Sequence, residues 1–90
     1  MSDLRDNTRQ HRFELDVDGH TALVVYRREA GTITFVHTEV PGALRGRGIG
    51  SRLATGALER ARAGGLTVVA QCPFIARYIA THPAYQDLLK

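Results

Sequence analysis

The segment from Val40 to Ala61, VPGALRGRGIGSRLATGALERA, contains the residues best suited to hold an anion. Arg45, Gly48 and Gly50 form an R-x-x-G-x-G pattern at the point where an amphipathic helix is expected to begin. The first turn of a helix presents unpaired N–H groups and the positive end of its dipole, which favour a bound phosphate. Glycine lets the backbone approach an anion closely, and arginine adds a charged fork of donors. The pattern therefore predicts a pyrophosphate site.

Two common phosphate-binding motifs do not fit this loop. A P-loop requires a Lys-Ser or Lys-Thr pair at a fixed distance from its glycines, and no such pair follows here. A dinucleotide fingerprint requires G-x-G-x-x-G after the first strand of a β-α-β unit, with an acidic residue about 20 residues later. Here the loop follows three expected strands and lacks that acidic residue. On its own the pattern leaves the identity of the pyrophosphate open.

Three side chains outside the loop could perform acid–base or nucleophilic chemistry. His37 and Glu39 lie two positions apart on an expected strand, so both should point to one face and Thr38 to the other. Either His37 or Glu39 could take a proton from an amine. Cys72 follows the next strand and precedes an expected helix, whose N-terminal dipole favours a thiolate. Packing roles are the open alternatives, since free cysteine is commonly buried and inert.

Hydrophobic periodicity predicts the elements that hold these residues. Alternating apolar residues predict strands over residues 11–19 and 20–29, joined by a turn at Asp18-Gly19. A β-branched and aromatic segment predicts a third strand over residues 32–40, which Pro41 ends. A helix is expected over residues 46–63, a fourth strand over 66–71 parallel to the third, and a second helix from Pro73 or Phe74. The helix over 46–63 should bury one apolar stripe, formed by Ile49, Leu53, Ala54, Ala57, Leu58 and Ala61.

The order of these elements predicts an α+β fold. An antiparallel three-strand meander is continued by a β-α-β unit, with helices packed on the sheet. Residues 1–10 are charged and show no periodicity, so we expect a flexible tail there. Residues 11–90 are then expected to form one domain, a size at which a single core is the limit.

Composition narrows the classes of partner. The chain has 90 residues, a net charge of +3 and one cysteine, which excludes an internal disulfide. The four histidines show no i, i+4 pairing, so we expect no metal site. We expect no membrane span, no signal peptide and a cytoplasmic location, because no long apolar run is present. The arginine-rich segment lacks interleaved aromatic residues, which argues against nucleic acid as a partner.

The segment TEVPGALRGRGIGSRLATGALERARAGGL resembles the coenzyme A-binding segment of the GCN5-related N-acetyltransferases. HTEVP, LRGRGIG and CPF…Y…HPAY resemble the motifs of a branch of short GNAT-like proteins in that family. The resemblance implies acetyl-CoA as co-substrate, with the backbone of Glu39 and Val40 facing the pantetheine and the acetyl group. It implies that the pyrophosphate is held by Arg45, Gly46, Arg47, Gly48, Ile49, Gly50 and Ser51.

The same resemblance implies acetyl transfer to an amine, either a small amine or an exposed lysine. Glu39 and His37 are then candidate bases, and Cys72 is a candidate carrier of the acetyl group. Tyr78 is a candidate acid, because a tyrosine on the corresponding helix of larger relatives protonates the leaving thiolate. A non-catalytic module that binds acyl-CoA is the alternative function. We expect a monomer, or a weak homodimer formed through an exposed sheet edge.

Overall fold

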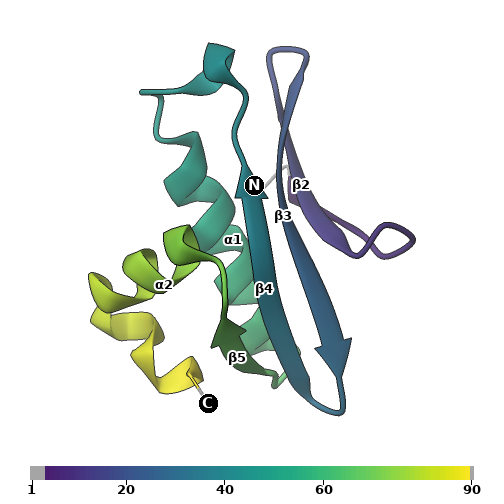
Figure 1. Cartoon of the computed structure of the whole chain (residues 1–90), viewed down its shortest axis with the longest axis vertical. Helices are drawn as coiled ribbons and strands as arrows, with labels where there is room; N and C mark the ends of the chain where they lie inside the picture. Colours follow the sequence, from purple (N-terminus) through teal and green to yellow (C-terminus); the bar gives the residue numbers. More distant parts are fainter. Residues whose placement is uncertain (1–3, 90) are drawn as a thin grey trace.

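Five strands form one mixed sheet in the computed structural model, which describes residues 4–89 (Figure 1). The strands lie side by side in their chain order, and the first four are antiparallel to their neighbours. The last strand is parallel to the fourth, as predicted. The strands are β1 (Leu4–Asn7), β2 (Arg12–Val17), β3 (His20–Glu29), β4 (Thr32–Glu39) and β5 (Thr67–Ala70).

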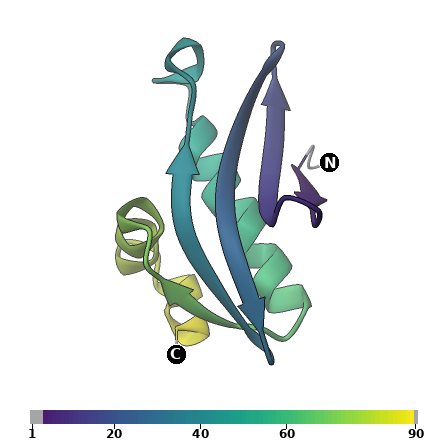
Figure 2. The same ribbon diagram turned by 45° about the vertical axis from the view of Figure 1, so that its right-hand side comes forward.

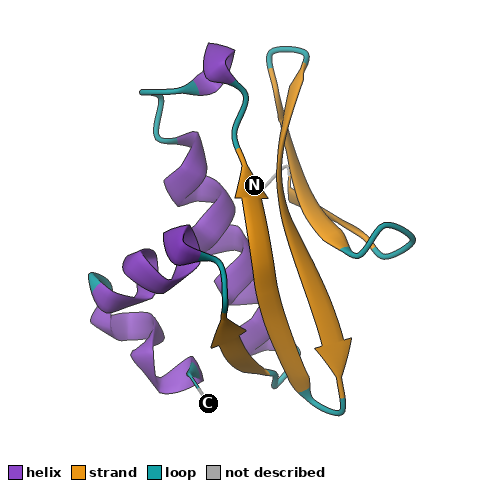
Figure 3. Cartoon of the chain, in the orientation of Figure 1, coloured by secondary structure: helices purple, strands orange, loops and turns teal. Residues whose placement is uncertain are grey.

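Residues 4–89 also form two α-helices and two short 3-10 helices, which are coloured purple in Figure 3. They are η1 (Gly42–Leu44), α1 (Ile49–Ala63), α2 (Pro73–Ala80) and η2 (Pro83–Leu88). Figure 2 shows α1 running behind β3 and β4. The predicted α+β fold is confirmed, with the meander leading into a β4-α1-β5 unit. In the described part of the chain, no helix has both the length and the apolar character that a membrane crossing needs.

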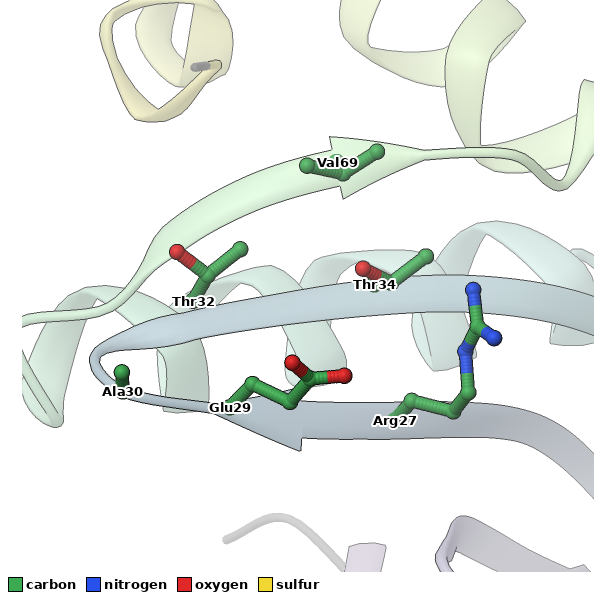
Figure 4. A pocket seen from close by; sticks show the side chains of 6 residues that line it. All are labelled: Arg27, Glu29, Ala30, Thr32, Thr34 and Val69. Atoms are coloured by element: carbon green, nitrogen blue, oxygen red, sulfur yellow. The ribbon is translucent and has the colours of Figure 1, made fainter.

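The core lies between the sheet and the helices. All six residues of the predicted stripe on α1 are buried, which confirms the stripe and its helical spacing. They pack with Ile33 and Phe35 of β4 and Ile75 and Ile79 of α2 in a single cluster. The opposite sheet face is open, and Figure 4 shows Thr32, Thr34 and Val69 along it with α1 behind the strands. The helices therefore cover one face and leave the other to solvent.

The prediction of a flexible tail is wrong for Leu4–Asn7, which forms β1 and pairs with β2. Residues 1–3 of the predicted tail lie outside the described residues. A tertiary contact explains the difference, because Leu4 is buried against α1 at Gly56. A Cβ at Gly56 would lie 2.9 Å from Leu4 Cδ2, so glycine leaves the space that Leu4 fills. Arg60 Nη2 also donates to the Leu4 carbonyl at 2.8 Å. These contacts involve residues far along the chain, which a local pattern does not reveal.

The helix expected to begin at Gly46 begins at Ile49 instead. Gly46 and Gly48 have φ angles of 79° and 72°, which belong to the left-handed region. A right-handed helix cannot contain such angles, so the loop extends to Gly48.

One extra residue interrupts the pairing of β4 with β3. Tyr26 pairs with Phe35 and Val25 pairs with His37, so Val36 has no partner across the ladder. A bulge of this kind reverses which side chains face the core. Before the bulge Ile33 and Phe35 are buried, and after it His37 and Glu39 are exposed. The bulge thus determines what the end of β4 presents on each face.

A buried carboxylate ties β1 to β2 on the open face. Glu14 is 3% exposed and accepts hydrogen bonds from Arg5 at 2.9 Å, Asn7 at 3.1 Å and Arg12 at 2.5 Å. Burial alone would raise the pKa of Glu14, but these three donors together outweigh it and leave the pKa below its ordinary value. The network makes the ionised carboxylate part of the fold.

We predict that Glu14→Gln lowers the free energy of unfolding by about 2 kcal/mol at pH 7, because bonds to a charged group are lost. The depressed pKa means that this contribution is present above about pH 4.5 and is lost as the pH falls through the folded-state pKa. Urea unfolding at pH 7 and pH 3 should show the difference between wild type and variant shrink in acid. Glu29→Gln is the control, since Glu29 is exposed and forms no ion pair within residues 4–89. Equal stability of Glu14→Gln and wild type at pH 7 would contradict the prediction.

Candidate functional site

The end of β4 brings two candidate bases together on the open face. His37 Nε2 lies 3.1 Å from Glu39 Oε2, and both side chains are more than half exposed. The predicted shared face of His37 and Glu39 is therefore confirmed. Thr38 points to the opposite face, as expected. The pair is accessible to a molecule that approaches the sheet from the side without helices.

Cys72 lies on the helix-covered side, next to the side chain of Thr38. Its Sγ is 3.1 Å from Thr38 Oγ1, and the residue is 3% exposed. The Cys72 amide donates to the Phe35 carbonyl at 2.8 Å, which fixes the residue at the start of α2. Strand β4 thus separates the thiol from the His37–Glu39 pair. Thr38 was not among the predicted site residues, because its contact depends on the path of the chain after β5.

The two parallel strands part beyond Phe35. Their pairing ends at Phe35 and Ala70, where the amides of Gln71 and Cys72 both donate to the Phe35 carbonyl. Past that point the chain turns into α2, and no backbone bond joins it to residues 36–39 within the described chain. This edge of β4 is therefore free to pair with another extended group.

The glycine-rich loop ends in an uncapped helix. Gly48 is the N-cap of α1, no side chain caps this end, and the first turn has no acidic residue. The Arg52 amide makes the first helical bond, to the Gly48 carbonyl at 3.1 Å. The amides before it, including those of Ile49, Gly50 and Ser51, are the donors that a helix leaves unpaired. This end of α1 is suited to an anion.

Gly50 also brings the two helices into contact. A Cβ built on Gly50 would lie 2.8 Å from Cζ of Phe74, which is the second residue of α2. The Phe74 ring thus lies directly on the first turn of α1 while remaining 39% exposed. Gly50, which was predicted to bind the pyrophosphate, therefore also leaves the space that Phe74 of α2 occupies.

A cavity of about 330 Å³ connects the loop to the end of β4. Three predicted cofactor-binding residues, Glu39, Val40 and Arg45, line it together with Thr21, Thr38 and Pro41. Arg45 is exposed and forms no ion pair with any other residue in the 4–89 range. Its guanidinium group is therefore available to an anion that enters the cavity.

Arg47, which was predicted to bind the pyrophosphate, forms an ion pair with another side chain instead of being free. Its Nη2 is 2.7 Å from Oδ2 of Asp18, which lies in the turn between β2 and β3. Both turn and loop lie at the same end of the molecule, at the top of Figure 1. The partner was missed because Asp18 was recognised only as a turn residue. Ser51 is also displaced from the cavity, since it is in α1 and lines a groove along that helix with Leu15 and Thr55.

Tyr78 is held away from the other candidates. Its hydroxyl contacts Thr55 Oγ1 on α1, and its ring stacks on His82 at 3.8 Å between centroids. No contact joins Tyr78 to Cys72 or to the His37–Glu39 pair in the part of the chain described. Within residues 4–89, no three side chains of His, Cys, Asp or Glu gather as a metal site would require.

The profile of a family described as "GCN5-related N-acetyl-transferase" matches residues 12–88. Protein NATD1 of Xenopus tropicalis is 32% identical over 83 residues, which cover 89% of this chain and 76% of that protein. A GCN5-like protein from Staphylococcus aureus, solved in solution by NMR, superposes with a TM-score of 0.74 at 29% identity. That superposition covers 100% of this chain and 91% of the other.

We predict that Gly48→Ala lowers the free energy of unfolding by about 1 kcal/mol, because a Cβ disfavours the left-handed backbone. Gly42→Ala is the matched control, since Gly42 has an ordinary φ and nothing lies within 4 Å of the position that an added methyl group would take. Thermal and urea unfolding should show a loss for Gly48→Ala alone. A Gly48→Ala variant as stable as Gly42→Ala would disprove the geometry assigned to the loop.

Proposed function

The chain belongs to the GCN5-related N-acetyltransferase family, and from this premise we propose that it binds acetyl-CoA and transfers the acetyl group to an amine. The observation that carries the proposal is the uncapped start of α1 beside the unpaired Arg45. Arg45 lines the cavity that reaches Glu39 and Val40 at the end of β4, and Gly48, the N-cap of α1, follows three residues later in the same loop. A polyanion with an extended arm matches this combination of a positive loop and a free strand edge.

The pyrophosphate is proposed to rest on the loop between Arg45 and Ser51. The amides of Ile49, Gly50 and Ser51 supply donors at the positive end of α1. Arg45 supplies a free guanidinium from the cavity wall, whereas Arg47 must exchange the Asp18 carboxylate for a phosphate oxygen. An exposed ion pair of this kind is weak, about 0–1 kcal/mol, so the exchange costs little.

The pantetheine arm is proposed to follow the free edge of β4. Among residues 4–89, nothing pairs with residues 36–39 on the β5 side, and Val40 lines the cavity that leads from the loop. An arm on this edge brings its thioester past Val40 to Glu39. Backbone groups of Glu39 and Val40 can then hydrogen-bond the arm and polarise the carbonyl oxygen as negative charge develops on it.

Acetyl transfer requires a neutral amine at the thioester carbon. The amine nitrogen forms a bond to the carbonyl carbon, the carbon–sulfur bond breaks, and coenzyme A leaves as a thiolate. The proton lost by the amine passes to the His37–Glu39 pair, which is exposed on the face that an acceptor can reach. We assign His37 and Glu39 the role of base, acting directly or through one water molecule. The role of Tyr78 as the acid stays a prediction.

Cys72 offers a second route, in which the acetyl group passes first to Sγ and then to the amine. The thiol is 3% exposed and faces Thr38, so this route requires the sulfur to be uncovered. Direct attack requires no such rearrangement, and we therefore assign it as the main route. Cys72 then contributes packing and a hydroxyl contact beneath β4.

We predict that Arg45→Glu weakens the binding of acetyl-CoA at least about tenfold, because a repulsive carboxylate replaces a phosphate-binding cation. Isothermal titration calorimetry on the folded protein measures the change. Arg77→Glu reverses the same charge on α2, outside the cavity, and should bind like wild type. Saturable binding lost only in Arg45→Glu supports the phosphate site. A folded wild-type protein that does not bind acetyl-CoA would remove both the site and the proposed reaction.

We predict that Glu39→Gln lowers kcat about 100-fold or more while acetyl-CoA affinity changes little, because the substitution removes a base and keeps the backbone. Turnover is measured by thiol release with a panel of small amines and a lysine peptide. Cys72→Ser should retain most activity, and rapid-quench intact mass should show no acetyl group on the wild-type chain.

Glu39→Gln and Cys72→Ser distinguish direct attack by the amine from transfer through Cys72. A Cys72-dependent acetyl adduct with full activity in Glu39→Gln would replace direct attack by the covalent route. Acetyl-CoA binding without turnover on any amine would instead identify a binding module.

A further inference from the structure

A second groove lies at the far end of β3, beyond the last residue paired with β2. It has a volume of about 630 Å³ and is walled by Thr8, Gln10 and His11 of the β1–β2 turn. Val25 and Tyr26 also line it, and residues 27–29 complete the lining. In Figure 1 this turn is the purple loop that projects to the right, whereas the glycine-rich loop lies at the top. The groove is therefore separate from the cavity that contains Arg45.

The groove contains a strand edge without a partner. Strand β2 pairs with β3 only as far as Arg12 and Val25, and the Tyr26 amide then donates to the His11 carbonyl at 2.9 Å. Residues 27–29 continue as strand but pair only with β4. In antiparallel pairing, alternate residues direct their N–H and C=O groups to the same side. Arg28, two residues after Tyr26, therefore directs its backbone groups toward the groove.

Residues 27–29 belong to an inner strand that extends past its partner β2, whereas β5 is an edge strand of the sheet. On the β5 side, Leu89 forms a parallel bridge with Val68 and so covers part of the outer edge. On the β3 side, nothing in the described chain pairs with residues 27–29 on the edge facing the groove. The Tyr26 ring beside this edge is buried, and its hydroxyl donates a hydrogen bond to Asp6. These contacts fix the side chain that forms this wall of the groove.

The charge around the edge is positive. Arg9, Arg27 and Arg28 are exposed and form no ion pair with any residue from 4 to 89. Glu29 is the only acidic residue that lines the groove as described. Figure 4 shows Arg27 and Glu29 on the open face, with the Arg27 side chain directed toward β4. Strand alternation puts Arg28 on the other face, so the edge carries one arginine on each face.

We propose that this edge binds an extended acidic peptide, which adds to the sheet as a strand beside residues 27–29. Main-chain hydrogen bonds to Arg28 set the register of the peptide against β3. Acidic side chains of the peptide then form ion pairs with Arg27 and Arg28. Because Arg27 and Arg28 point to opposite faces, two consecutive acidic residues satisfy both. A second copy of this chain is a poor occupant, since it would bring the same arginines against each other. The proposal is independent of acetyl transfer.

The test uses a fluorescein-labelled peptide containing Val-Glu-Glu-Val and the full chain, with binding followed by fluorescence anisotropy. We expect saturable binding, slower hydrogen exchange at the Arg28 amide, and weakening of at least about tenfold in the double variant Arg27→Glu, Arg28→Glu. Arg77→Glu is the matched charge control and should bind the peptide like wild type. Acetyl-CoA titration of the double variant should be unchanged, which separates this site from the proposed active site.

Two further probes distinguish strand addition from simple charge attraction. A peptide of the same sequence with N-methylated backbone amides should lose binding, and a Val-Lys-Lys-Val peptide should not bind. Equal affinity of the N-methylated peptide overturns the proposal, as does unchanged affinity in the double variant. Single-stranded DNA of matched charge that binds as tightly at this groove would identify a general anion trap and would also overturn it. If the double variant does not fold, Arg9→Glu with the same peptides replaces it.

Discussion

One extra residue in β4 governs what the end of this sheet can do. Val36 has no partner on β3. Odd-numbered residues of β4 face the core before this bulge and face solvent after it. Without the bulge, the faces of His37 and Thr38 would be exchanged. With it, His37 and Glu39 meet on the open face while Thr38 reaches Cys72 beneath the sheet. A single backbone irregularity thus separates a polar, accessible pair from a buried thiol.

The parallel pairing of β4 with β5 ends at Phe35, and this leaves the end of β4 with an unpaired edge in the described chain. The Phe35 carbonyl accepts the amides of Gln71 and Cys72, so the chain leaves the sheet and begins α2 at that point. The edge of β4 beyond it is free, and Phe74 of α2 lies on Gly50 at the start of α1. The free edge of β4 and the uncapped start of α1 are therefore positioned by the same short stretch of chain.

Sequence reasoning succeeded where local physics decides the structure. The stripe on α1 repeats with the helical period, and the Asp18-Gly19 turn has the backbone angles that such a pair adopts. It failed where distant residues decide. Strand β1 depends on the space that Gly56 leaves for Leu4, and the Arg47 partner depends on a turn in another hairpin. The shared face of His37 and Glu39 was predictable from strand alternation, whereas the bulge that selects which face gave no signal in the sequence.

The central claim is that the glycine-rich loop and the free edge of β4 form one binding surface for acetyl-CoA. An NMR titration of the ¹⁵N-labelled chain with acetyl-CoA tests it most directly, because each backbone amide reports separately. We expect the largest shifts at the amides of residues 45–51 and 36–40, saturating together with one affinity. Shifts confined to other parts of the sheet, or two sets of shifts with different affinities, would contradict the claim.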